Sequence, residues 1–285
     1  MINSLNLLLP EIFLSLSIFT ILLVGVFVKD SYDLTNKLSL LALLATSIII
    51  FNSDSFNAKA FSESFLRNSF TNYIKILILI SSILILNSSQ LFIKENNIDK
   101  FEYPIIVMLA ILGMFIMVSS NDLILFYLGL ELQSLALYIL AAIDRDNIRS
   151  TESGIKYFVL SALSSGLLLY GCSLLYGFTG STNFNIISTQ LNSQNTGAIF
   201  SMVFILVGLA FKISAVPFHM WTPDVYEGSP TSITGFFAVA PKIAGLAVLI
   251  RFMQDPFKNI LVEWQMIIIF ISIASMILGA VAAIG

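Results

Sequence analysis

The chain has 285 residues, of which 57% are hydrophobic and only 11% are charged, and its formal net charge is -3. Soluble domains carry roughly 25% charged residues, so this composition excludes a soluble fold, as does the mean hydropathy of +0.92. No block of like charges is long enough to hold nucleic acid through its phosphates. The single cysteine, Cys172, supplies neither an internal disulfide nor the ligands of an iron–sulfur cluster.

Apolar stretches separated by short polar breaks recur along the whole chain. A helix needs about 20 apolar residues to cross a bilayer. The stretches are nearly continuous and do not alternate in polarity, which favours helices over barrel strands. We therefore predict an all-α integral membrane fold, one domain over residues 1–285, built as a bundle of about nine transmembrane helices. Their expected positions are 10–28, 37–51, 73–92, 103–119, 122–143, 153–177, 197–218, 229–253 and 264–284, of which the second is the shortest and can extend toward Leu34.

A few charged residues lie inside these apolar spans. Glu131, Lys212 and Lys242 lie well inside, and Lys156 lies one turn inside another span. A charge at a helix centre costs about 2.5 to 3.5 kcal/mol on the insertion scale. Because a cost of that size usually has a functional reason, we interpret these residues as sites of ion or proton transfer. The alternative for Glu131 is a neutral carboxylic acid that is hydrogen-bonded only for helix packing.

Prolines lie beside both central lysines. Pro217 has no N–H to donate to the carbonyl of Ile213 and clashes with it, so we expect the helix to break beside Lys212. Irregular backbone at membrane depth lines protein or a water-filled cavity, which is the surrounding that a proton-exchanging amine needs. Lys242 directly follows Pro241, which predicts a second broken helix, with a simple proline kink as the alternative.

Other titratable residues allow two interpretations each. Lys156 is either a proton relay or a lysine whose long stem reaches the membrane interface. His219, the only histidine, could titrate near neutral pH or be a plain hydrogen-bonded linker residue. Asp224 and Glu227 lie in the same polar turn and are either surface groups or the mouth of a proton path.

A family resemblance is carried by residues 210–231, which read AFKISAVPFHMWTPDVYEGSPT. This segment resembles the signature of the antiporter-like membrane subunits of proton-pumping NADH:quinone oxidoreductase, respiratory complex I. Residues 154–166, GIKYFVLSALSSG, and 239–242, VAPK, are similar to the branch of that family called chain N in bacteria and subunit 2 in mitochondria.

The resemblance implies the first half of an inverted-repeat fold. In that family fourteen helices contain two inverted five-helix repeats, and the resemblance covers the first nine helices. It implies three amino-terminal helices in residues 1–100, a first proton-translocating repeat in 101–253, and the incomplete start of a second repeat in 254–285. On this basis we expect a chain truncated after its ninth helix.

The resemblance also assigns roles to the buried charges. Glu131 matches the family's glutamate of the fifth helix, Lys156 the lysine of the sixth, Lys212 that of the broken seventh and Lys242 that of the eighth. It implies that Lys212, paired with Glu131, is the central proton site and that Lys242 passes protons onward. His219 is added as a further candidate for proton transfer.

The function implied is a proton-translocating membrane subunit of NADH:quinone oxidoreductase, a translocase coupled to quinone reduction elsewhere in the complex. No redox centre and no bound cofactor are expected in this chain, since NADH and quinone are used by the whole complex. The alternatives are a subunit of a multi-subunit cation/proton antiporter and a membrane scaffold that conducts nothing. The expected partners are a neighbouring antiporter-like subunit, small complex I membrane subunits and the lipid bilayer. The expected location is the bacterial inner (plasma) membrane, with the mitochondrial inner membrane as the alternative.

Overall fold

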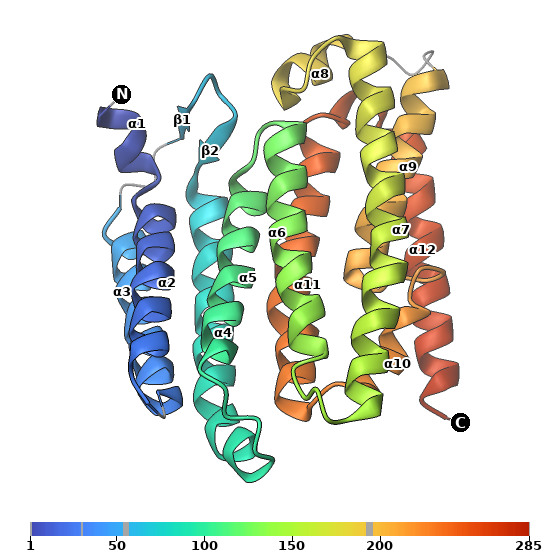
Figure 1. The fold of residues 1–285 in the computed structure, drawn as a ribbon. Helices are drawn as coiled ribbons and strands as arrows, with labels where there is room; N and C mark the ends of the chain where they lie inside the picture. Colours follow the sequence, from blue (N-terminus) through green and yellow to red (C-terminus); the bar gives the residue numbers. More distant parts are fainter. Residues whose placement is uncertain (1, 30, 54–56, 192–195, 285) are drawn as a thin grey trace.

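The computed structural model describes residues 2–29, 31–53, 57–191 and 196–284 (Figure 1). Most of them lie in helices, and within these ranges nine helical segments are long and apolar enough to cross a membrane. The predicted all-α membrane bundle is therefore confirmed.

The spans are α2 (Leu9–Phe27), α3 (Tyr32–Phe51), α4 (Ser69–Glu95), α5 (Glu102–Ser119), α6 (Leu123–Ala141), α7 (Ile148–Thr179), α9 (Thr196–Ile213), α11 (Thr231–Gln254) and α12 (Leu261–Ala282), the last preceded by the short 3-10 helix η1 (Lys258–Ile260). The shorter elements are α1 (Ile2–Leu7), α8 (Phe184–Gln190), α10 (Trp221–Gly228) and the strands β1 (Ala58–Ala60) and β2 (Phe65–Arg67). The second span extends past Leu34, as its sequence allowed.

Polar residues at the membrane surfaces start several of these helices. The side chain of Asn68 accepts the N–H of Thr71 at 2.8 Å, which closes a capping box at the start of α4. Asp122 accepts the N–H of Ile124 at 2.8 Å and starts α6 in the same way. These caps satisfy the first amide groups of each helix and fix where the span enters the membrane.

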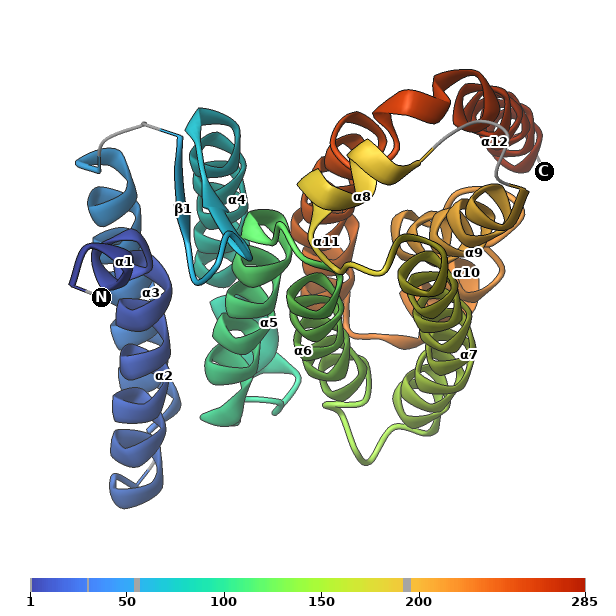
Figure 2. The same cartoon turned by 90° about the horizontal axis from the view of Figure 1, so that it is seen from above.

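Seen from above, α2 and α3 stand at one edge of the molecule and α12 at the other (Figure 2). Helices α5 and α6 pack closely, α7 packs along α9, and α11 contacts α4, α5 and α9. No described side chain of α12 is buried, because this helix contacts only its neighbours at the edge.

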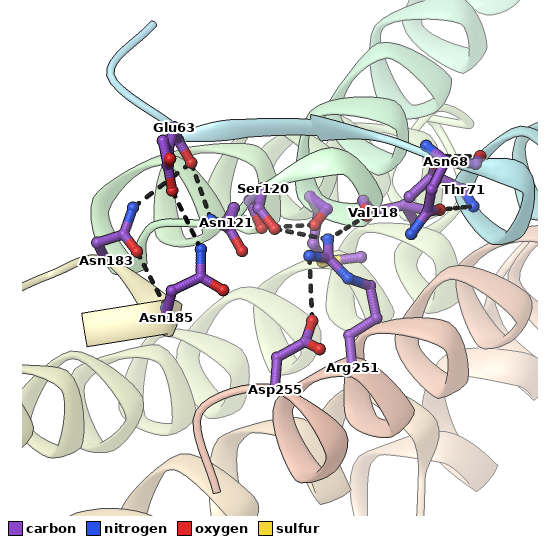
Figure 3. Close-up of polar contacts among 11 residues, drawn as sticks. Glu63, Asn68, Thr71, Val118, Ser120, Asn121, Asn183, Asn185, Arg251 and Asp255 are labelled. Carbon is purple, nitrogen blue, oxygen red and sulfur yellow. Dashed lines mark hydrogen bonds and ion pairs between the residues drawn. The ribbon is translucent and has the colours of Figure 1, made fainter. Parts of the chain in front are cut away.

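An antiparallel hairpin of β1 and β2, which the sequence did not predict, covers one end of the bundle. Its turn is anchored to a loop and to a short helix: the backbone carbonyl of Glu63 accepts Asn121 Nδ2 of the loop before α6 at 2.9 Å, and its carboxylate accepts Asn185 Nδ2 of α8 at 3.3 Å (Figure 3). The hairpin thereby ties the start of α6 to α8.

Arg251 is 5% exposed and closes the same end of the bundle from α11. Its Nη1 donates to the carbonyls of Val118 and Ser120 at 2.7 and 2.6 Å, and its Nη2 contacts Asp255 at 3.3 Å (Figure 3). The two carbonyls belong to the carboxyl end of α5, where a cation also complements the helix dipole.

Helix α11 corrects one prediction, since it runs without a break through Pro241. The missing N–H of Pro241 removes one hydrogen bond, and a helix packed on several neighbours tolerates that loss. The alternative of a proline inside an otherwise continuous helix is therefore the correct one at this position.

Candidate functional site

The predicted helix break beside Lys212 is present. Helix α9 ends at Ile213, and Ser214 takes the left-handed conformation with φ 61°. Ala215 N–H donates to the carbonyl of Ala210 at 2.9 Å, and Ser214 N–H to that of Phe211 at 3.1 Å, which is a Schellman end. The chain then turns through residues 214–220 into α10, because Pro217 cannot continue the helix.

The ammonium of Lys212 is held by hydroxyl groups on two other helices. The residue is 8% exposed, and its Nζ donates to Ser134 Oγ of α6 and Ser161 Oγ of α7, both at 2.7 Å. Tyr138 donates its phenolic proton to the same Ser161 oxygen at 2.5 Å. An ammonium has three N–H donors, so two fixed hydroxyl acceptors hold it in one position and leave one donor for exchange.

Glu131 lies on α6 near Ser134 and is half-buried. Its Oε1 is buried and has no hydrogen-bond partner among the described residues. Glu131 and Lys212 interact electrostatically, but no direct ion pair joins these two described residues. The structure therefore places the two residues in one region without the direct pairing that the resemblance implied, and proton exchange between them requires a side-chain rotation or a bridging water.

Lys242 reaches from α11 to the broken end of α9. Its Nζ donates to the backbone carbonyl of Lys212 at 3.1 Å and also to the hydroxyl of Ser214. The same ammonium lies over the ring of Trp221, 4.7 Å from its centroid. The Trp221 Nε1 donates to the carbonyl of Phe211 at 3.1 Å, as a second hydrogen bond beside the one from Ser214 N–H, so both Lys242 and Trp221 bind carbonyls in the last turn of α9.

Lys156 faces the membrane surface. Its side chain is 43% exposed and forms ion pairs with Glu152 at 2.8 Å and Asp224 at 2.7 Å. These residues line a polar cleft of about 240 Å³ together with Glu227 and Arg149. Lys156 thus has the geometry of a lysine that reaches the interface, and Asp224 and Glu227 are exposed groups at the mouth of a cleft.

His219 lies in the turn between α9 and α10, half-buried. Its Nδ1 is buried and has no hydrogen-bond partner among the described residues. Within the described part of the chain, the buried Nδ1 therefore lacks the hydrogen bond that one interpretation expected, and His219, beside the break of α9, stays a candidate for proton transfer.

Sequence reasoning missed a buried ion pair outside this site. Lys75 of α4 and Glu11 of α2 are 1% and 5% exposed, and their Nζ and Oε1 atoms lie 2.5 Å apart. The signal was present, since Lys75 is the single charge in the apolar run 74–80. What the sequence lacks is any mark that Glu11, 64 residues away, is its partner.

The fold and the site together define a class: a multi-pass helical membrane protein in which a discontinuous helix carries a buried lysine, Lys212, at its broken end, as in membrane transporters. The family model of the NADH:quinone oxidoreductase/Mrp antiporter transmembrane region matches residues 120–285, more than half of the chain. The chain belongs to this family, and the predicted family resemblance is confirmed.

Relatives of known name agree with this assignment. The chain is 56% identical over 284 residues to NADH-quinone oxidoreductase subunit N of Pelagibacter ubique and 53% identical over 281 residues to that of Parvibaculum lavamentivorans. These alignments cover 99% and 97% of this chain, but 60% and 58% of the relatives. The chain thus spans about three fifths of the length of the relatives it matches.

Solved structures give the same fold. A chain of respiratory complex I from Thermus thermophilus matches with a TM-score of 0.75 and 29% identity, over 85% of this chain and 53% of that one. A chain of the archaeal membrane-bound sulfane sulfur reductase matches with a TM-score of 0.76 at 23% identity, over 88% of this chain and 53% of that one. A chain of the Mrp complex from Dietzia sp. matches at 0.70 and 21%, over 90% and 50%. The last two show the fold alone.

Proposed function

We propose that this chain translocates protons as the antiporter-like subunit N of an NADH:quinone oxidoreductase. The observation that carries the proposal is the position of Lys212, whose ammonium lies between two hydroxyls of neighbouring helices and directly beside a helix break. A buried amine with fixed acceptors and irregular backbone next to it has what a proton-exchanging group requires.

In the proposed mechanism the proton is held on Lys212 by Ser134 and Ser161 and exchanged toward Glu131, which has a free buried oxygen one helical turn from Ser134. Lys242 contacts the backbone at the carboxyl end of α9, the helix that carries Lys212. A change in the charge of Lys242 therefore alters the electrostatic potential at the broken end of α9. Lys156 and its carboxylate partners stand at the membrane surface, where protons enter or leave.

The proposal extends to organisation and partners. Residues 101–253 form the translocating unit and carry the four family-matched residues Glu131, Lys156, Lys212 and Lys242. Residues 1–100 form a flanking three-helix unit, and residues 254–285 are the start of a second unit. The chain itself binds neither NADH nor flavin, and redox chemistry elsewhere in the complex drives it. Its neighbours are another antiporter-like subunit and small membrane subunits, in the inner membrane of a bacterium.

A subunit of a cation/proton antiporter is the alternative within the same family. The family model covers both kinds of protein. Identity of 48–56% to relatives named subunit N favours the oxidoreductase, while the Mrp complex chain is only 21% identical. No contact in the site favours the antiporter over the oxidoreductase among the described residues.

The test is proton pumping by the assembled complex in sealed membrane vesicles, with NADH oxidation followed in parallel. Lys212→Met is compared with Lys258→Met, an exposed lysine outside the site. We expect the first variant to lose pumping and coupled quinone reduction while the complex still assembles, and the second to behave as wild type. Normal pumping by the assembled Lys212→Met complex would show that the buried lysine is only structural.

A further inference from the structure

A large cavity lies at the membrane surface, where the turn between α2 and α3 meets the turn between α4 and α5. Its volume is about 820 Å³. The helix ends around it come from the α2–α3 and α4–α5 hairpins, and α6 and α11 stand between these hairpins and α9 (Figure 2). Its polar and charged lining residues are Lys29, Ser31, Tyr32, Asp33, Lys94, Asp99, Lys100 and Glu102.

The charges around this cavity are balanced, with three lysines and three carboxylates. Lys94 pairs with Asp33 at 2.6 Å, and Lys100 donates to a backbone carbonyl at 3.4 Å. Lys29, Asp99 and Glu102 form no ion pair with another described residue, although they line the same space. The cavity therefore offers one uncommitted cation and two uncommitted carboxylates to a ligand.

An apolar groove of about 540 Å³ runs along α2 and α3 on the membrane-facing edge. On α2 its lining includes Thr20 and Val24, and one further helical turn along the same face is Val28, which lines the charged cavity. On α3 the groove is lined by Leu38 and Ala42, about two to three turns beyond the start of the helix at the cavity. The groove and the cavity thus follow one another along the same pair of helices.

We propose that the cavity and the groove together bind one phospholipid with a zwitterionic, amine-bearing headgroup such as phosphatidylethanolamine. Lys29 faces the phosphate, Asp99 and Glu102 receive the ammonium of the headgroup, and an acyl chain lies in the groove. The balanced lining favours a headgroup without net charge over an anionic one. The carboxylates favour an ammonium over a quaternary amine, because only the ammonium has N–H groups to donate. This inference is independent of the proton-transfer proposal.

The site joins two parts of the bundle, since its walls come from the α2–α3 hairpin on one side and the α4–α5 hairpin on the other. The ring of Phe101 already packs against Gly25 there, so the two hairpins touch at the back of the cavity. A lipid bound beside the contact between Phe101 and Gly25 fills the cavity. Without it, the charged lining of the cavity would be exposed next to the acyl chains of the membrane.

The experiment uses the full-length protein in its complex, purified in mild detergent and mixed with vesicles of phosphatidylethanolamine, phosphatidylcholine or phosphatidylglycerol. Native mass spectrometry then counts the lipid retained on the subunit. The variant combines Lys29→Gln with Asp99→Asn, and the matched control combines Lys37→Gln with Asp146→Asn, exposed residues of the same types outside the cavity. All four side chains are exposed, so both variants fold, and melting temperature checks this.

We expect wild type and control to retain phosphatidylethanolamine in preference to the other two lipids, and the Lys29/Asp99 variant to lose that preference. Equal retention of the three lipids by wild type, preferential retention of the anionic lipid, or an unchanged preference in the variant would each overturn the proposal. Proton pumping is measured separately on the Lys212 variant, so failure of one proposal does not imply failure of the other.

Discussion

The side chain of Lys242 closes the end of the helix that carries Lys212, with 3.1 Å between its Nζ and the Lys212 carbonyl oxygen. The helix break leaves this carbonyl without an intrahelical donor. The two lysines are thus connected through backbone and not through a direct side-chain bond. A change in the position or charge of one is transmitted to the other by the turn at Ser214.

Replacing Lys242 by Met should loosen this turn. The substitution keeps much of the apolar stem but removes the ammonium, and a cation at a helix carboxyl end contributes about 0.3 to 2 kcal/mol. We expect faster amide hydrogen exchange in residues 214–220 and weaker proton pumping. Lys258→Met serves as the control. If amide hydrogen exchange in residues 214–220 were unchanged, the backbone hydrogen bonds of the Schellman motif alone would be enough to hold the end of α9 in place.

Replacing Ser161 by Ala should slow proton transfer without unfolding the bundle. The change removes one of the two hydroxyl acceptors of Lys212, and a hydrogen bond to a charged group contributes about 1.5 to 3 kcal/mol. The lost hydrogen bond stabilises the protonated form of Lys212, so we expect the rate of proton pumping to fall by about tenfold or more.

Ser164→Ala is the matched control for this experiment. Ser164 lies on the same helix and is buried, but its hydroxyl has no hydrogen-bond partner among the described residues. Equal pumping rates in the two variants would show that the hydroxyl of Ser161 has no specific role.

The end of α9 could be predicted from the sequence because its cause is local. Pro217 excludes a helical bond to Ile213 by covalent structure alone, wherever the helix lies. The same reasoning failed at Pro241, since packing on neighbouring helices keeps α11 continuous despite the missing hydrogen bond. A local rule therefore predicts a strained position, while the surrounding helices decide whether the chain breaks there.

Partners that are distant in sequence could not be predicted. The sequence indicates that Lys75 is a lone charge in an apolar run, but Glu11 becomes its partner only when α2 and α4 pack. The hairpin is similar, because strands of three residues are too short to show an alternating pattern of polarity. Its turn is held by Asn121 and Asn185, which are distant in the sequence. These contacts appear only in the folded bundle.

The Glu11–Lys75 pair allows a test of what a buried charge pair contributes. Lys75→Met leaves the carboxylate of Glu11 buried without its cation, which should destabilise the protein by about 3 to 5 kcal/mol. Combining it with Glu11→Leu removes both charges and should restore most of the stability. Thermal unfolding of the purified protein in detergent measures both. A double variant as unstable as Lys75→Met would contradict this account.

The anchoring of the hairpin should depend on pH through Glu63. A hydrogen bond from Lys59 at 2.7 Å, together with its charge, lowers the pKa of the Glu63 carboxyl from its ordinary 4.5. A carboxyl whose folded pKa is lowered stabilises the fold above its unfolded pKa, and this contribution is lost as pH falls through the lowered value. The hairpin should therefore loosen only below about pH 4.5.

Pepsin cleavage within residues 57–68 measures this effect, because pepsin acts at acidic pH. The ratio of cleavage in wild type to that in Glu63→Gln cancels the pH dependence of the protease. We expect wild type to be protected relative to Glu63→Gln at pH 5, and this protection to disappear as the pH falls through the lowered pKa of the Glu63 carboxyl. A ratio that does not change with pH would exclude a role for the carboxylate.

The close crossing of α5 and α6 should be sensitive to one added methyl group. A Cβ at Gly113 would press against the backbone nitrogen of Gln133 and lie 2.9 Å from the Gly129 carbonyl oxygen, and backbone atoms cannot turn away as a side chain can. Small residues at such crossings let two membrane helices approach closely. Gly113→Ala must therefore push α6 away from α5, at a cost of about 1 to 3 kcal/mol.

The displacement has a functional consequence, because Glu131 and Ser134 lie on the segment of α6 that touches Gly113. Moving that segment away from α5 disturbs the 2.7 Å hydrogen bond between Ser134 and Lys212, so we expect Gly113→Ala to lower proton pumping as well as the melting temperature. Gly166→Ala is the control, since no atom lies within 4 Å of a Cβ built at that glycine. A loss of stability in Gly113→Ala with full pumping would mean that the site adjusts to the shift, and equal behaviour of both variants would mean that α5 and α6 are not in close contact.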